Sequence, residues 1–250
     1  KNYKRTIYAC FIGYIVQAIV NNFIPLLFVT FQKSYGIPLS KITLLITVNF
    51  VIQLLIDAFS TLFVDKIGYR ASVIIAHVAA ATGLILLTVL PEIMPDAFLG
   101  IFLSVCVYAV GGGLLEVLVS PIVEACPTEN KEKMMSLLHS FYCWGSVGVI
   151  SLSALFFAVA GTQHWRVLTL VWAILPAANA VLFLFVPLAS LSEDGAPSMR
   201  ISELLKSKSF WFYFLIILGA GAAESAVAQW ASAFAEKGLG VSKTLGDLFG

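Results

Sequence analysis

The sequence has little charge for its length. Aspartate, glutamate, lysine and arginine make up 12% of the 250 residues, whereas 60% are hydrophobic, and the mean hydropathy is +0.94. A soluble domain of this size needs more surface charge, so the composition predicts a polytopic membrane protein. The net charge of +1 and the lack of a basic run give no indication of nucleic-acid binding.

Motifs for cofactor chemistry are absent as well. There is no G-x-x-x-x-G-K-[S/T] segment to drive transport by nucleotide hydrolysis. No cysteine–histidine cluster has metal spacing, so we expect no metal and no cofactor. The four cysteines predict no disulfide, because they lie in or at the ends of apolar runs: Cys10, Cys106, Cys126 and Cys143.

Seven long apolar runs dominate the chain. A bilayer core of about 30 Å takes about 20 helical residues, and none of the runs alternates as a strand would. We therefore predict an all-α membrane protein. Its spans are residues 6–31, 42–64, 71–90, 97–123, 134–160, 165–188 and 210–234, and an eighth begins near Val241.

The distribution of lysine and arginine predicts the orientation. With the N-terminus in the cytoplasm, ten of these residues fall on the cytoplasmic side and five outside. The longest polar connection, residues 190–209, then lies in the cytoplasm. We expect it to separate a six-helix bundle, residues 1–189, from the start of a second, incomplete bundle, residues 210–250.

The segment DKIGYR, residues 65–70, joins two spans by a tight turn. Gly68 lets the chain reverse, and Asp65 and Arg70 can pair with each other or cap a neighbouring helix end. The spacing resembles the loop between spans two and three of the major facilitator superfamily, although Thr61 and Tyr69 depart from that pattern. The resemblance implies two six-helix halves and alternating access, with Asp65, Lys66, Gly68 and Arg70 as a cytoplasmic gating loop.

Glu116 follows three glycines in the fourth predicted span and precedes Ser120-Pro121. The glycines allow close approach of a helix or a ligand. The pattern resembles the fourth span of the fucose:proton symporter group, which implies that Glu116 binds the proton and helps to hold a sugar. Since a charge inside a membrane is costly, intramembrane carboxyls are functional by default. The alternative is a structural glutamate bonded to a neighbouring helix.

Glu224 follows small residues in the seventh predicted span. Ser225, Gln229 and Ser232 follow it on a shared face. The G-x-x-E arrangement resembles span seven of the same symporter group, which implies a second proton-coupling carboxyl beside Gln229 as a solute ligand. Packing through small residues is an equally weighted alternative.

Polar side chains also line one face of the first span. Tyr14, Gln17 and Asn21 share a helix face, and Asn22 adjoins them. The asparagine pair resembles the first span of the sugar symporters, but Pro25 stands where an aspartate usually follows. Interhelical hydrogen bonds return only about 0.6 kcal/mol on average, so the row favours a wet cavity.

The second and fifth spans carry further candidates. Asn49 and Gln53 are expected to face the same cavity, as are His139 and Tyr142 of span five. Asp57 continues the stripe of span two. It is a cytoplasmic gate partner or, as we prefer, part of a structural pair.

Together these features predict a secondary active transporter that takes up a sugar or similar polar solute with protons. A uniporter or exchanger of another small organic solute stays open. An intramembrane enzyme lacks its usual residue pairs, and a seven-helix receptor is disfavoured because an eighth span begins and the seventh contains no lysine to anchor retinal. We expect a monomer in a cell membrane, whose partners are the solute, protons and lipid.

Overall fold

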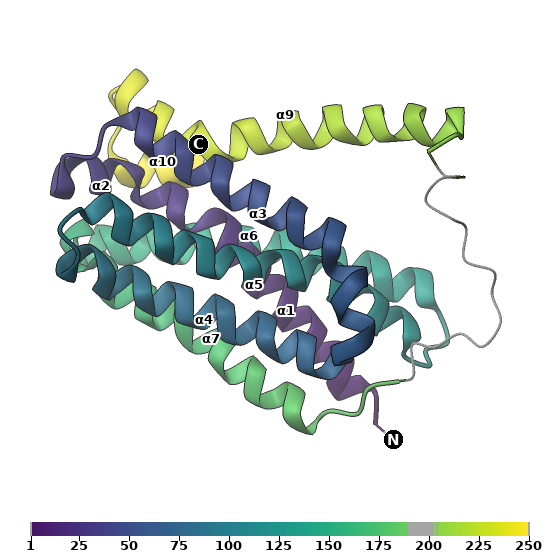
Figure 1. The fold of residues 1–250 in the computed structure, drawn as a ribbon. Coiled ribbons are helices and arrows are strands. Elements are labelled where there is room, and N and C mark those ends of the chain that lie inside the picture. Colours follow the sequence, from purple (N-terminus) through teal and green to yellow (C-terminus); the bar gives the residue numbers. More distant parts are fainter. Residues whose placement is uncertain (1, 190–202, 204, 250) are drawn as a thin grey trace.

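The computed structural model describes residues 2–189, 203 and 205–249, and within this part every regular element is helical. Seven helical stretches are long and apolar enough to cross a membrane. Figure 1 shows them as a bundle with α9 along one side. The elements are α1 Lys4–Asn22, η1 Ile24–Leu27, α2 Phe28–Tyr35, α3 Leu39–Ile67, α4 Tyr69–Ile93, α5 Ala97–Ala125, α6 Lys131–Ala160, η2 Thr162–His164, α7 Trp165–Phe185, α9 Lys208–Gly238 and α10 Lys243–Phe249.

The first span is the most buried, and its helix is interrupted within the predicted range 6–31. It consists of α1, η1 and α2, with Pro25 at the start of the 3-10 turn η1. Proline has no amide hydrogen to donate, and its ring obstructs the preceding helical turn. The α-helical pattern of α1 therefore stops at Asn22 and resumes at Phe28.

Glycines bring α3, α4 and α5 into backbone contact. A Cβ at Gly111 would lie 2.6 Å from Ala76 O of α4, and one at Gly113 would lie 3.0 Å from Gln53 Cα of α3. Gly83 of α4 is equally close to the backbone of Tyr108 on α5. The three glycines before Glu116 therefore serve the approach of helices.

We call the end of the bundle where α1 and α4 begin the inner end, and the end where α3 and α5 begin the outer end. At the inner end the Arg70 guanidinium caps α7. Its Nη1 donates to Phe183 O at 2.6 Å and its Nη2 to Val186 O at 2.8 Å. These carbonyls belong to the helix terminus, where four acceptors lack an intrahelical partner. Of the two roles predicted for Arg70, the structure shows the capping of a neighbouring helix end.

The rest of the turn fits its role as a tight reversal. Gly68 has a φ of 87°, a backbone conformation that residues with a side chain rarely adopt. Lys66 is exposed. The side chain of Asp65 lies outside the described part of the structure, and so does the predicted pairing with Arg70. Most of the expected linker, residues 190–209, also lies outside it.

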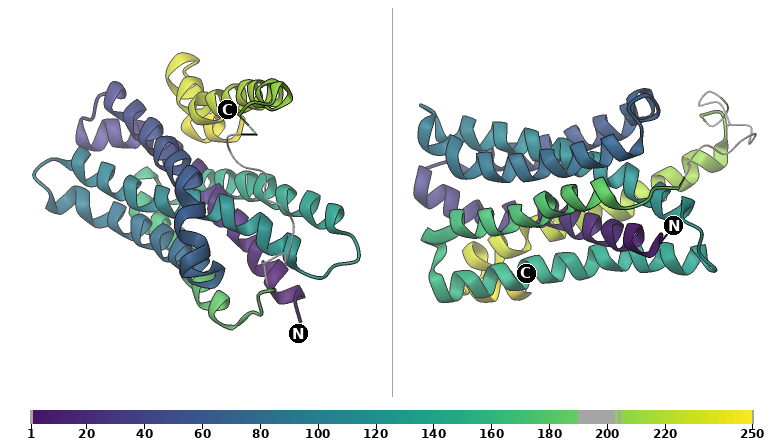
Figure 2. Two further views of the ribbon diagram at one scale, coloured as in Figure 1. Left: turned by 45° about the vertical axis from the view of Figure 1, so that its right-hand side comes forward. Right: turned by 90° about the horizontal axis from the view of Figure 1, so that it is seen from below.

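Helices α9 and α10 join the bundle at its outer end. Trp230 of α9 packs against Phe28 with ring centroids 5.6 Å apart, and Lys243 of α10 donates to Leu26 O at 2.6 Å. Lys33 of α2 forms an ion pair with Glu236 of α9 at 3.0 Å. Toward the inner end, α9 runs away from the other helices, and its side chains there are exposed (Figures 1 and 2).

We predict that Gly111→Ala destabilises the protein and Gly148→Ala does not. An added methyl at Gly111 meets the α4 backbone, whereas at Gly148 of α6 nothing lies within 4 Å. Overpacking of this kind costs about 1–3 kcal/mol. The melting temperature of the purified protein in detergent should therefore fall for Gly111→Ala alone. Equal melting temperatures for the two variants would show that the α4–α5 contact is not tight.

Candidate functional site

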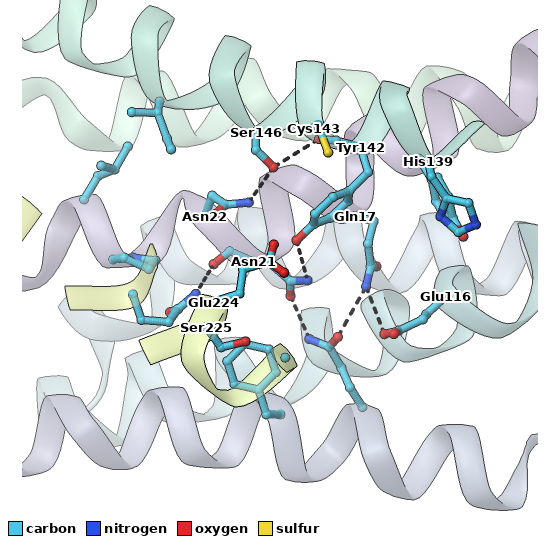
Figure 3. A pocket seen from close by; sticks show the side chains of 18 of the residues that line it. Gln17, Asn21, Asn22, Glu116, His139, Tyr142, Cys143, Ser146, Glu224 and Ser225 are labelled. Atoms are coloured by element: carbon cyan, nitrogen blue, oxygen red, sulfur yellow. Dashed lines mark hydrogen bonds between the residues drawn. The ribbon is translucent and has the colours of Figure 1, made fainter. Parts of the chain in front are cut away.

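A polar cavity of about 840 Å³ lies between α1, α3, α5 and α6, with α9 and α10 on its remaining side. Figure 3 shows its side chains converging from these helices. It contains all but one of the side chains that the sequence suggested for solute or proton binding. Those that line it are Tyr14, Gln17, Asn21, Asn22, Gln53, Glu116, His139, Tyr142, Glu224 and Gln229.

Gln53 is the centre of an amide network at the middle of the bundle. Its Nε2 donates to Asn21 Oδ1 at 2.9 Å and to Asn49 Oδ1 at 3.0 Å, and its Oε1 accepts from Gln17 Nε2 at 3.3 Å. All four amide side chains are buried. Asn49 is the exception among the expected solute ligands, because it supports Gln53 from behind and does not line the cavity.

Glu116 lies at the edge of this network and faces the open cavity. Its Oε2 accepts from Gln17 Nε2 at 3.4 Å, while the carboxyl group itself is exposed to the cavity. The same amide thus bonds both Glu116 and Gln53. A change in the charge of Glu116 therefore acts directly on a side chain of the amide network.

Helix α6 forms an aromatic wall opposite α3. Tyr142 OH accepts from Asn21 Nδ2 at 3.4 Å, and the ring of His139 lies 5.5 Å from that of Tyr14. Tyr14 OH is in turn 2.8 Å from Ser120 Oγ of α5. The wall therefore presents ring faces and hydroxyl groups side by side.

Helix α9 contributes two of the expected residues. Gln229 is buried, and its Nε2 donates to Asn21 O at 3.0 Å, which ties α9 to α1. Glu224 lines the cavity and is exposed, on the part of α9 that leads away from the bundle. Gln229 therefore serves the helix contact, while Glu224 is free to face the cavity.

Several lining residues were not among the expected ligands. Asp57 lines the cavity, although the sequence favoured a structural pair for it. Its spacing of four residues from Gln53 was the available signal. Ser146 of α6 accepts from Asn22 Nδ2 at 3.1 Å, and Asp247 of α10 lies next to Lys243. The spacing of Ser146 from His139 and Tyr142, at i, i+3 and i+7, was an available signal, whereas no such pattern distinguishes Asp247.

The family model of the Major Facilitator Superfamily matches residues 10–250. The chain belongs to this superfamily. Membership in this superfamily confirms the predicted fold and indicates a transporter rather than an enzyme.

A solved structure of similar fold is described as the crystal structure of a D-xylose-proton symporter. It matches with a TM-score of 0.70 at 15% sequence identity, over 99% of this chain and 65% of that chain. The chain thus spans about two thirds of the length of that transporter. Among curated proteins there is no match.

We predict that Gln53→Leu destabilises the protein, because it removes the shared partner of three buried amides. Each unsatisfied buried group costs about 1–3 kcal/mol. Thr47→Val on the same helix is the control, since Thr47 is exposed and bonds only its own helix at Thr43 O. Thermal unfolding in detergent should show a lower melting temperature for Gln53→Leu alone. A similar small change in both variants would mean that the network adds little.

Proposed function

We propose that this protein takes up a sugar or similar small polar solute together with protons, by alternating access in a cell membrane. The observation that supports this most strongly is a carboxyl group, Glu116, in the wall of a polar cavity at membrane depth. The fold shared with a symporter for D-xylose and protons supports the same proposal.

The chemistry of the cavity suits a polyhydroxylated solute. A hydroxyl group both donates and accepts hydrogen bonds, and an amide side chain offers both functions as well. Asn21, Asn22 and Gln17 supply such amides, and Tyr14 and Tyr142 supply ring faces that can stack on the apolar face of a sugar ring. The volume of about 840 Å³ falls in the range of small-molecule sites.

The proton enters this proposal through Glu116. Enclosing an ionised carboxyl in a closed cavity is costly, whereas the neutral form is tolerated. As a carboxylate, Glu116 accepts from the Gln17 amide. Once protonated, it can donate instead. Proton uptake therefore removes a charge that opposes occlusion and changes the bonding of an amide in the solute cavity. Glu224 is proposed to add a second carboxyl from α9.

The contacts at the outer end are consistent with one state of an alternating-access cycle. Lys33–Glu236 and the Lys243 contact with Leu26 O close the cavity there, while α9 diverges at the inner end. We propose that residues 65–70 act as the gating loop, through the tie between α4 and α7, and that residues 1–189 form one bundle of the transporter.

We predict that Glu116→Gln abolishes solute-dependent proton uptake. Cells that express the full-length protein are placed in weak buffer and given pulses from a panel of sugars and polyols. One solute should make the medium alkaline, and Glu116→Gln should lose the signal because its amide cannot carry a proton. The control is Glu124→Gln, on the same helix but exposed and outside the cavity lining, which should behave like the wild type.

The outcomes separate the mechanisms. Uptake of a labelled sugar without a pH change would identify a uniporter or exchanger. No uptake and no pH change with any member of the panel, with the protein shown to be in the membrane, would overturn the proposal for sugars. A pH response that persists in Glu116→Gln would assign the proton to another group.

A further inference from the structure

The cavity lining contains a further carboxyl group, Asp57 of α3, which the proposed mechanism does not use. Asp57 is half-buried, and its Oδ1 is buried with no hydrogen-bond partner among the described residues. The Glu116 carboxyl is close enough to act on it electrostatically. An ionised carboxylate in this position would leave a buried negatively charged oxygen unpaired, which is costly.

The helix geometry accounts for this proximity. Helices α3 and α5 both run from the outer to the inner end, and Gly113 brings them into contact at Gln53. Asp57 follows Gln53 by one turn and Glu116 follows Gly113 by nearly one turn. At 1.5 Å per residue, Asp57 lies about 15 Å and Glu116 about 14 Å from the inner helix ends, so the carboxyls share one depth.

The groups around the pair do not supply a positive counter-charge. Among the described residues that line the cavity there is no lysine or arginine. The other titratable groups of the lining are Tyr14 of α1, Glu116 of α5, His139, Tyr142 and Cys143 of α6, Glu224 of α9 and Asp247 of α10. His139 lies about 12 Å from the inner end of α6.

A second acceptor in the same region also lacks a donor. Gln17 is only 3% exposed, and its Oε1 has no hydrogen-bond partner in the described structure, although its Nε2 donates to Glu116. A rotation of the amide by half a turn exchanges the two atoms. Gln17 would then accept a hydrogen bond from a protonated Glu116. A proton on the carboxyl pair, Asp57 and Glu116, would therefore supply the O–H donor that the unpartnered oxygens of Gln17 and Asp57 lack.

We propose that Asp57 is a further proton-coupling residue, which shares one proton with Glu116 and passes it toward the inner end of the cavity. This role rests on the proposed proton-coupled function. In the transfer an O–H bond breaks at Glu116, which becomes a carboxylate, and one forms at Asp57, which becomes neutral. The pair keeps one negative charge during this transfer, and it takes on a second only when the proton leaves the pair. Asp57 then releases the proton to water at the inner end.

Infrared difference spectra of the purified protein, taken between acid and alkaline pH, test the shared proton directly. Two carboxyls that share a proton titrate as a pair, so each substitution should alter the same neutral-carboxyl band. We expect the band to be lost or shifted in both Asp57→Asn and Glu116→Gln, and kept in Asp57→Glu and in the control Glu124→Gln. A band that Asp57→Asn leaves unchanged would overturn the proposal.

Transport measurements then test the coupling role. With a solute from the panel, Asp57→Asn should lose uphill accumulation to a greater extent than solute exchange, because exchange needs no net proton movement. Asp57→Glu should restore accumulation, because it brings back a carboxyl group. If the loss in Asp57→Asn came only from a structural defect, the longer glutamate side chain would not be expected to repair it. Accumulation at the wild-type level in Asp57→Asn would overturn the inference and leave the proposed function intact. If the wild type itself moves no protons with any solute, the proposed function fails, and with it the coupling role, whatever the spectra show.

Discussion

The cost of an unpartnered polar group in a hydrocarbon environment governs how this bundle is arranged. Water is not available at the middle of a span, so polar side chains must bond to each other or line a wet cavity. Gln53 does both, because it bonds Gln17, Asn21 and Asn49 while it faces the cavity. The polar residues of four helices consequently gather at one place, and the lipid-facing sides are left apolar.

Backbone packing determines where that place can be. Gly111 and Gly113 remove the side chains that would keep α5 away from α4 and α3. Helices in contact at this level carry the side chains of the next turn to the same depth, which is why Asp57 and Glu116 both line the cavity at a similar depth. The glycine segment therefore positions the carboxyls without touching a solute. Packing and proposed chemistry depend on the same three residues.

The sequence was sufficient for the spans, which follow from the length of the apolar runs, and for most of the polar side chains in the cavity lining, which follow from helical periodicity. The stripe of Tyr14, Gln17 and Asn21 lies on one face of α1, as its spacing required. Periodicity does not tell which of two polar residues one turn apart faces the cavity. Asn49 and Asp57 flank Gln53 at equal spacing, and only Asp57 lines the cavity.

Contacts between segments far apart in the chain also could not be predicted from the sequence. His77 was not among the predicted site residues, and its Nε2 lies 2.7 Å from Asn179 Nδ2, which donates to Ala9 O at 3.0 Å. The cluster joins α4, α7 and α1 at positions more than a hundred residues apart. Arg70 likewise donates to carbonyls at the end of α7, more than a hundred residues further along the chain. Such pairings depend on which helices become neighbours, and local patterns carry no information about that.

The depths of the polar groups suggest why solute and proton can be coupled in so small a volume. The amide network lies near the middle of the spans, and the carboxyl pair lies about one turn nearer the inner end. Gln17 connects the two levels, because its single amide bonds Gln53 on one side and Glu116 on the other. A protonated carboxyl keeps one acceptor oxygen and gains an O–H donor, so protonation of Glu116 offers Gln17 a hydrogen bond of the opposite direction, which Gln17 can accept by turning its amide. The amides proposed to hold the solute would then be reorganised by the proton without any movement of the helices.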